Sequence, residues 1–94
     1  MTKVRIPPVL RETVGGAREL EASGATVREV LDDLFTRQPA LAARVAPDGD
    51  LSAFVNVYVN GRDIRYTDGP LTVVGPGDTV ILLPAMAGGV TSDR

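Results

Sequence analysis

The residues best suited to chemistry lie near the end of the printed sequence, where Gly88 and Gly89 stand side by side. Neither has a side chain, so this stretch could pass through a narrow crevice in which any β-carbon would clash. Met86 and Ala87 precede the pair, and an apolar run over residues 79–83 comes before them. Such a tail suits the presentation of a backbone carboxylate to another protein's active site. Small residues are also common in chain ends without a function, so the tail alone does not decide between the two interpretations.

The composition leaves few routes by which this chain could catalyse a reaction itself. Its 94 residues include no Cys and no His, and Lys3 is the single lysine. These absences exclude disulfides, cysteine nucleophiles, histidine general bases and zinc sites built on thiolate or imidazole groups. We therefore expect no catalytic residue, no metal site and no cofactor in this chain.

Size and charge narrow the class of protein further. A chain of this length forms one domain, and an apolar fraction of 44% is ordinary for a folded protein. The formal net charge is −2 without a basic stripe, which argues against nucleic-acid binding. The sequence shows neither an apolar run of membrane-spanning length nor, in residues 1–5, the apolar segment of a signal peptide. We expect a cytoplasmic protein without membrane contact.

The clearest predicted element is a helix over residues 26–38. Thr26 and Glu29 match a capping box, in which each side chain binds a backbone N–H at the helix start. Pro39 predicts the end of the helix, and a further turn or two is expected over residues 40–45. The apolar side chains recur at helical spacing and form one stripe: Val27, Val30, Leu31, Leu34 and Phe35.

Short strands are predicted on both sides of this helix. Residues 3–7 and 18–22 form a first hairpin with a turn at Gly15-Gly16. Asn60-Gly61 is typical of a tight type I′ turn, from which residues 62–66 return as a strand. Residues 79–83 form the last strand. The alternation over residues 54–59 puts two sets of side chains on opposite faces: Val55, Val57 and Val59 toward the helix, and Phe54, Asn56 and Tyr58 away from it.

This order of elements predicts an α+β fold of the β-grasp type, the plan of ubiquitin. We expect a mixed four- to five-stranded sheet with one main helix packed across it. In this plan the first and last strands lie side by side in the sheet centre, so the tail leaves from a rigid platform. The domain is predicted to span residues 1–84, with a flexible tail over residues 85–94.

Five segments together suggest a family: residues 4–7, 25–27, 54–60, 75–78 and 81–89. With these segments the chain resembles the ubiquitin-like sulfur-carrier proteins of the MoaD/ThiS family over nearly its whole length. Within that family it looks most like the carriers of cysteine biosynthesis, whose tails are similarly Pro-Ala-x-Ala before Gly-Gly. The resemblance implies that the chain donates sulfur in the biosynthesis of cysteine or of a sulfur-containing metabolite.

The resemblance also implies a site and its partners. A ubiquitin-activating-type adenylating and sulfurtransferase enzyme would adenylate the Gly89 carboxylate, and sulfide or a persulfide would convert it to a thiocarboxylate. Met86, Ala87 and Gly88 would present this group, and a sulfur-accepting biosynthetic enzyme would take the sulfur. Residues 90–94 follow Gly89, however, so its carbonyl lies in an amide that cannot be adenylated. The resemblance implies that a JAMM-type metalloprotease removes this extension.

Two further groups of residues have alternative interpretations. Phe54 and Tyr58, with Arg62 and Arg65 near the hairpin, could form a partner-docking face. Packing under a loop explains the two aromatic residues equally well, and ordinary surface charge is the default interpretation of the two arginines. The pair Asp32-Asp33 is interpreted as solvent-exposed rather than as a metal or acid–base pair, because neighbours on a helix diverge by roughly 100°.

Other functions fit the same sequence. The chain could be the small subunit of molybdopterin synthase, with its tail inserted into a large subunit. It could be a ubiquitin-like protein modifier that forms isopeptide bonds with lysines, or an interaction module with an inert tail. The final sulfur acceptor stays open.

Overall fold

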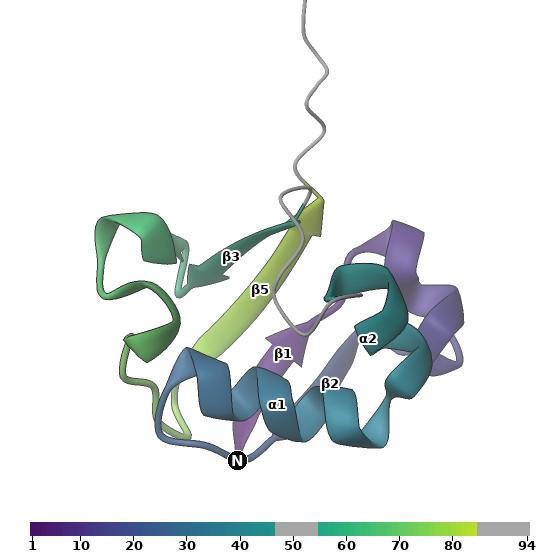
Figure 1. The fold of residues 1–94 in the computed structure, drawn as a ribbon, viewed down its shortest axis with the longest axis horizontal. Coiled ribbons are helices and arrows are strands. Elements are labelled where there is room, and N and C mark those ends of the chain that lie inside the picture. The colour runs from purple at the N-terminus through teal and green to yellow at the C-terminus, as the bar shows by residue number, and fades with distance from the viewer. Residues whose placement is uncertain (47–54, 85–94) are drawn as a thin grey trace, which may run out of the picture.

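The computed structural model describes residues 1–46 and 55–84, in which five strands form one mixed sheet (Figure 1). The strands are β1 (Thr2–Arg5), β2 (Glu19–Ala22), β3 (Val55–Val59), β4 (Arg62–Asp63) and β5 (Thr79–Pro84). Their order in the sheet is β2-β1-β5-β3-β4. β1 and β5 are parallel neighbours, and the other pairs are antiparallel. The predicted central pairing of the first and last strands is therefore confirmed.

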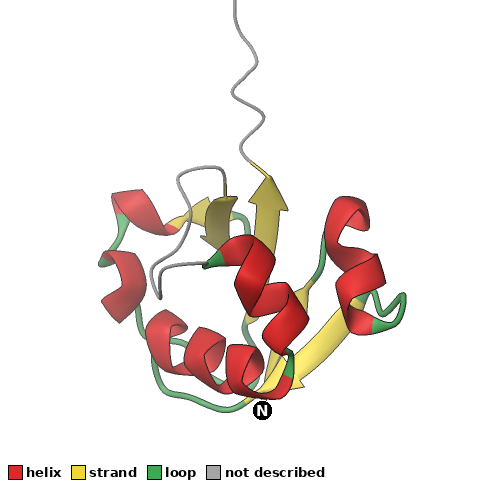
Figure 2. Ribbon diagram, turned by 45° about the vertical axis from the view of Figure 1, so that its right-hand side comes forward, coloured by secondary structure: helices red, strands yellow, loops and turns green. Residues whose placement is uncertain are grey.

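Helices α1 (Val27–Arg37) and α2 (Pro39–Val45) cover one face of this sheet, as Figure 2 shows. Pro39 follows the end of α1 and starts α2, where its missing N–H leaves no helical hydrogen bond unmade. The connections contain the short 3-10 helices η1 (Pro8–Val14), η2 (Ile64–Tyr66) and η3 (Gly69–Leu71). The predicted helices are both confirmed.

The start of α1 is fixed by the predicted capping box. Thr26 Oγ1 accepts a hydrogen bond from the backbone N–H of Glu29 at 3.3 Å. Glu29 Oε1 reaches back and accepts from the backbone N–H of Ala25 at 2.9 Å. The first bond pairs an N–H that has no partner within the helix, and the second ties Glu29 to the residue before the N-cap Thr26, so together they set where α1 begins.

The hydrophobic core lies between α1 and the sheet. Four of the five predicted stripe residues are buried in it: Val27, Val30, Leu31 and Leu34. The fifth, Phe35, is partly buried against them. The central strands contribute further buried side chains to the same cluster: Val4, Val57, Val80 and Leu82. The stripe was therefore assigned to the correct side of the helix.

Two predicted connections differ from the structure. The returning strand after Asn60-Gly61 was expected to reach residue 66, but β4 ends at Asp63 and η2 follows directly. The cause is local, because Asp63 Oδ1 accepts from the backbone N–H of Arg65 at 2.9 Å and caps η2. The first hairpin contains η1 between its strands, an element that the sequence analysis did not predict.

Candidate functional site

The candidate site is the carboxyl end of β5, because the Gly-Gly segment follows it in the sequence. Val80 and Leu82 on this strand are fully buried and hold it in the core. β5 pairs with β1 on one side and with β3 on the other, and the pairing with β3 continues to Pro84. Figure 1 shows this end of β5 on the opposite side of the molecule from the N-terminus. The sheet thus fixes the point at which residues 85–94 begin.

A hydrogen-bond network fixes the opposite end of β5. Asp78 Oδ2 accepts from the backbone N–H of Gly75 at 2.9 Å, and Asp78 Oδ1 accepts from the Asn60 side-chain amide at 2.8 Å. Asn60 Oδ1 accepts in turn from the backbone N–H of Thr79 at 3.0 Å. The Asn60 amide, followed by the Gly75 N–H, lowers the pKa of Asp78. Asn60 (φ 53°) and Gly61 (φ 88°) have the positive φ angles that the predicted tight turn requires.

The face of the sheet turned away from the helices carries an apolar strip beside the end of β5. The strand register pairs Ile81 with Tyr58, and Leu83 with Asn56. Residues paired directly across antiparallel strands lie on the same face, and this face is opposite to the buried side chains of β5. Leu83 is 42% exposed although it is apolar. A partner that receives the tail would meet Leu83 close to it.

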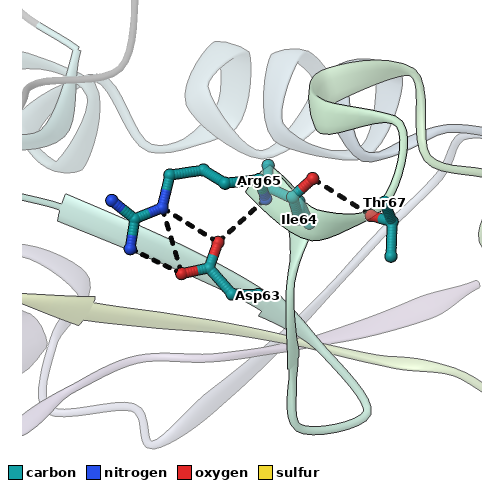
Figure 3. Close-up of polar contacts among 4 residues, drawn as sticks. All are labelled: Asp63, Ile64, Arg65 and Thr67. Carbon is teal, nitrogen blue, oxygen red and sulfur yellow. Dashed lines mark hydrogen bonds and ion pairs between the residues drawn. The ribbon is translucent and has the colours of Figure 1, made fainter.

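Asp63 and Arg65 form an ion pair at the edge of this face, shown in Figure 3. Arg65 Nη2 donates to Asp63 Oδ2 at 2.7 Å, and Arg65 Nε lies 3.2 and 3.1 Å from the two carboxylate oxygens. The side-chain hydrogen bonds of Arg65 lower the pKa of Asp63, and those of Asp63 raise the pKa of Arg65. The Asp63 side chain is 8% exposed and that of Arg65 is 66% exposed, so a buried carboxylate holds an exposed guanidinium in place. Thr67 Oγ1, also drawn, donates to the Ile64 carbonyl at 3.1 Å.

The structure brings two of the predicted docking residues together and places a third apart. Tyr58 pairs directly with Asp63, which holds Arg65. Arg62 pairs with Val59, and so lies toward the other face of the sheet at its edge. The remaining residues predicted for the site lie outside the described part of the chain: Phe54, Met86, Ala87, Gly88 and Gly89. Their roles stay predictions.

The residues that the structure describes offer neither a cluster of metal ligands nor a membrane-spanning helix. Within residues 1–46 and 55–84, no three His, Cys, Asp or Glu side chains gather closely enough to hold a metal ion. None of the helices in that part of the chain is both long enough and apolar enough to cross a bilayer.

The fold and the segment after β5 define a small ubiquitin-like domain, and comparison with known proteins identifies its family. The ThiS family matches residues 4–89. The chain therefore belongs to the ThiS family. Sulfur carrier protein CysO of Mycobacterium tuberculosis is 40% identical to it over 89 residues, which cover 92% of this chain and 96% of that protein.

Solved structures agree with this assignment. A chain in the crystal structure of the Amycolatopsis orientalis BexX/CysO complex is 44% identical, with a TM-score of 0.83, over 95% of this chain and 100% of that one. The solution structure of small archaeal modifier protein 1 (SAMP1) from Methanosarcina acetivorans is 34% identical, with a TM-score of 0.83, over 94% of this chain and 95% of that one. These similarities confirm the predicted β-grasp fold and the resemblance to the sulfur carriers.

Proposed function

We propose that this chain is a sulfur carrier whose Gly89 bears a thiocarboxylate after residues 90–94 have been removed. The observation that carries the proposal is the family match, which spans residues 4–89 and ends at the second glycine of the pair. The 40% identity with sulfur carrier protein CysO supports it over nearly the whole chain. The position of β5 in the sheet centre supports it too, since a central strand gives the tail a rigid base.

The proposed chemistry needs one reacting group from this chain. A carboxylate oxygen of Gly89 attacks the α-phosphorus of ATP, and pyrophosphate leaves to give an acyl adenylate. Sulfide then attacks the acyl carbon, and AMP leaves, so the carboxylate becomes a thiocarboxylate. An adenylating enzyme supplies the catalysis, and a biosynthetic enzyme removes the sulfur. The chain itself is a protein substrate and not the enzyme.

The outer face of the sheet is the proposed docking surface for the adenylating enzyme. Tyr58, Ile81 and Leu83 supply apolar area beside the end of β5, and Arg65 supplies a charge that Asp63 already holds in position. A guanidinium that an ion pair already holds in place loses less side-chain conformational entropy when a partner binds. Phe54, which directly precedes β3, is proposed to extend this surface, while Arg62 would contact only a partner that reaches around the sheet edge.

The direct test compares three versions of the chain with the adenylating enzyme of the same organism. The chain ending at Gly89 should support ATP–pyrophosphate exchange, whereas the chain ending at Arg94 should not, because only a free Gly89 carboxylate can attack ATP. A chain ending at Ala87 is the matched control, since it has a free carboxylate but lacks both glycines. Equal exchange with the versions ending at Gly89 and Arg94 would refute the need for processing by a JAMM-type metalloprotease.

A ubiquitin-like modifier is the second candidate, favoured by the similarity to small archaeal modifier protein 1. In that case the activated Gly89 would form isopeptide bonds with lysines of other proteins. Mass spectrometry of the chain from its own cells separates the two functions. A mass ending at Gly89 with one oxygen replaced by sulfur supports the carrier, and conjugates to lysine support the modifier.

A further inference from the structure

The exposed edge strand β2 carries a second feature, unrelated to the tail. Among the described residues β2 is the last strand on its side of the sheet, and the edge of a sheet presents backbone N–H and C=O groups to any other strand. A hollow of about 270 Å³, lined in part by Leu20, Leu34 and Gln38, runs beside this edge. The side chains of an added strand would have room there.

The ladder between β1 and β2 shows which groups of β2 point outward. The backbone N–H of Ile6 donates to the Arg18 carbonyl at 2.8 Å. Hydrogen-bonded and non-hydrogen-bonded pairs alternate along an antiparallel ladder, so Leu20, two residues on, also bonds to β1. Glu19 and Glu21 lie between these positions and direct their N–H and C=O groups away from the sheet.

Asp33 and Arg37 of α1 occupy part of this outer edge, and we refer to these two residues as the clasp. Asp33 Oδ2 accepts from the backbone N–H of Ser23 at 2.9 Å and from Arg37 Nη2 at 2.8 Å. Arg37 Nη2 also donates to the carbonyl of Glu21. Asp33 keeps the solvent exposure predicted for it, with 36% of its side chain exposed, but it also bonds to the edge of the sheet.

We propose that the clasp blocks strand addition at β2 and so prevents this edge from pairing with β2 of a second copy. The clasp satisfies the Glu21 carbonyl and the Ser23 N–H, which an added strand would otherwise use. The Ser23 N–H, followed by the Arg37 guanidinium, lowers the pKa of Asp33, so the carboxylate keeps its charge in mild acid. Charged groups that cover a sheet edge are a common protection against edge-to-edge association.

A second copy fits this edge because the outward positions are symmetric about Glu21. In an antiparallel pairing of β2 with β2, Glu21 lies opposite Glu21 of the other copy, and Glu19 lies opposite Ser23. The backbone groups that point away from the sheet at Glu19, Glu21 and Ser23 then all find partners in a single register. The like-charge pair that lies directly opposite in this register is Glu21 with Glu21, and Lys3, which stands across from Glu21 on β1, relieves it.

Removal of the clasp tests this proposal in the full chain. Asp33→Ala combined with Arg37→Ala should raise the association constant about tenfold or more in sedimentation equilibrium, because edge hydrogen bonds become available in both copies. The matched control is Arg28→Ala combined with Asp32→Ala, which removes an ion pair of the same spacing on the same helix, with both side chains at least 66% exposed. The control should sediment like the native chain. Circular dichroism checks that both variants are folded.

Two variants in the clasp-free background locate the contact. Glu21→Pro removes only an outward N–H, so it should restore the monomer and leave the pairing with β1 intact. Glu21→Cys should form a disulfide-linked dimer, since paired Cα atoms about 5.5 Å apart are within disulfide range. Glu19→Cys should not, because the same register separates these residues by about 13 Å. The native chain has no cysteine, so each cross-link is unambiguous.

A folded clasp-free variant that sediments like the native chain over the whole concentration range would overturn the proposal. So would a dimer that persists after Glu21→Pro, because the contact would then lie elsewhere. If the double variant unfolds, a chain with Glu21→Cys and Arg37→Ala gives the same test through cross-linking. Arg37→Ala is sufficient there because it frees the backbone carbonyl at position 21. Absence of the cross-link in that folded variant would also overturn it.

Discussion

Gly24 joins β2 to α1 at a point where no side chain fits. A β-carbon added there would lie 2.5 Å from the backbone nitrogen of Val30 and 2.7 Å from the Glu29 β-carbon. Such distances force either the connection or the first turn of α1 to move, and that turn carries the capping box. The close approach of this glycine to the helix therefore helps to set how α1 lies on the sheet.

We predict that Gly24→Ala destabilises the chain by about 1–3 kcal/mol, the usual cost of an overpacked site. Gly77→Ala is the control, because an added β-carbon there meets no atom within 4 Å. It should change the free energy of unfolding by less than about 1 kcal/mol. Urea denaturation of both variants measures the difference, and equal stabilities would show that the connection adapts without cost.

Gly88 and Gly89 are predicted to matter for chemistry and not for stability. Both variants are made in the chain ending at Gly89. Gly89→Val places a branched side chain on the residue that carries the reacting carboxylate, and Gly88→Val places one on the preceding residue. A displacement of about 1 Å can cost on the order of 100-fold in rate, so both variants should lose thiocarboxylate formation by at least that factor. Mass spectrometry follows the product. Normal rates for either variant would exclude a narrow channel around the tail.

At the scale of whole elements, α1 is held by its buried stripe. Leu31 is 4% exposed and packs in the core cluster, so Leu31→Ala should cost roughly 2–5 kcal/mol of unfolding free energy. Val73→Ala is the matched control, since Val73 is 74% exposed in a connecting segment. A loss below about 1 kcal/mol for Leu31→Ala in denaturant would show that α1 contributes little to the core.

The elements predicted correctly are those whose signals are local. The spacing of the Val27-to-Leu34 stripe and the Asn60-Gly61 turn depend on residues within a few positions of one another. Of the predicted site, the sequence places the glycine pair after the last strand, but it does not show that β4 ends at Asp63 or that this carboxylate holds Arg65. Asp63 ends the strand through a side-chain hydrogen bond that strand periodicity does not reveal.

Sequence patterns also missed polar contacts between distant segments. Asp33 and Arg37 have the ordinary spacing of a surface ion pair on a helix, and nothing in that spacing distinguishes them from Arg28 and Asp32. Their bonds to Ser23 and Glu21 exist only because α1 crosses the sheet next to β2. The bond between Asn60 and Asp78 likewise needs β3 and β5 side by side. Polar residues that tie two elements together are thus the least predictable part of this fold.

For the molecule as a whole, a hydrogen bond from a backbone N–H to an aspartate carboxylate recurs at three places around the sheet. Asp33 binds the edge of β2, Asp63 caps the end of β4, and Asp78 closes the turn before β5. In each case hydrogen bonds to the carboxylate hold its pKa below the usual value. These three aspartates therefore couple the stability of the whole fold to their ionisation.

The sign of this coupling predicts how the chain responds to acid. A carboxyl group whose pKa is lowered by folding stabilises the fold above its unfolded pKa of about 3.9, and this contribution is lost as the pH falls through the lower folded pKa. With no histidine present, the free energy of unfolding should change little from about pH 7 to 5 and decline steeply below about pH 4.

Asp78→Asn should be less stable than the native chain at neutral pH, and its free energy of unfolding should decline less steeply in acid. Urea denaturation across this range gives both curves, which should converge at the lowest pH because the native Asp78 is then protonated as well. A difference between the curves that stays constant into strong acid would show that the charge of Asp78 does not contribute to holding β5 in place.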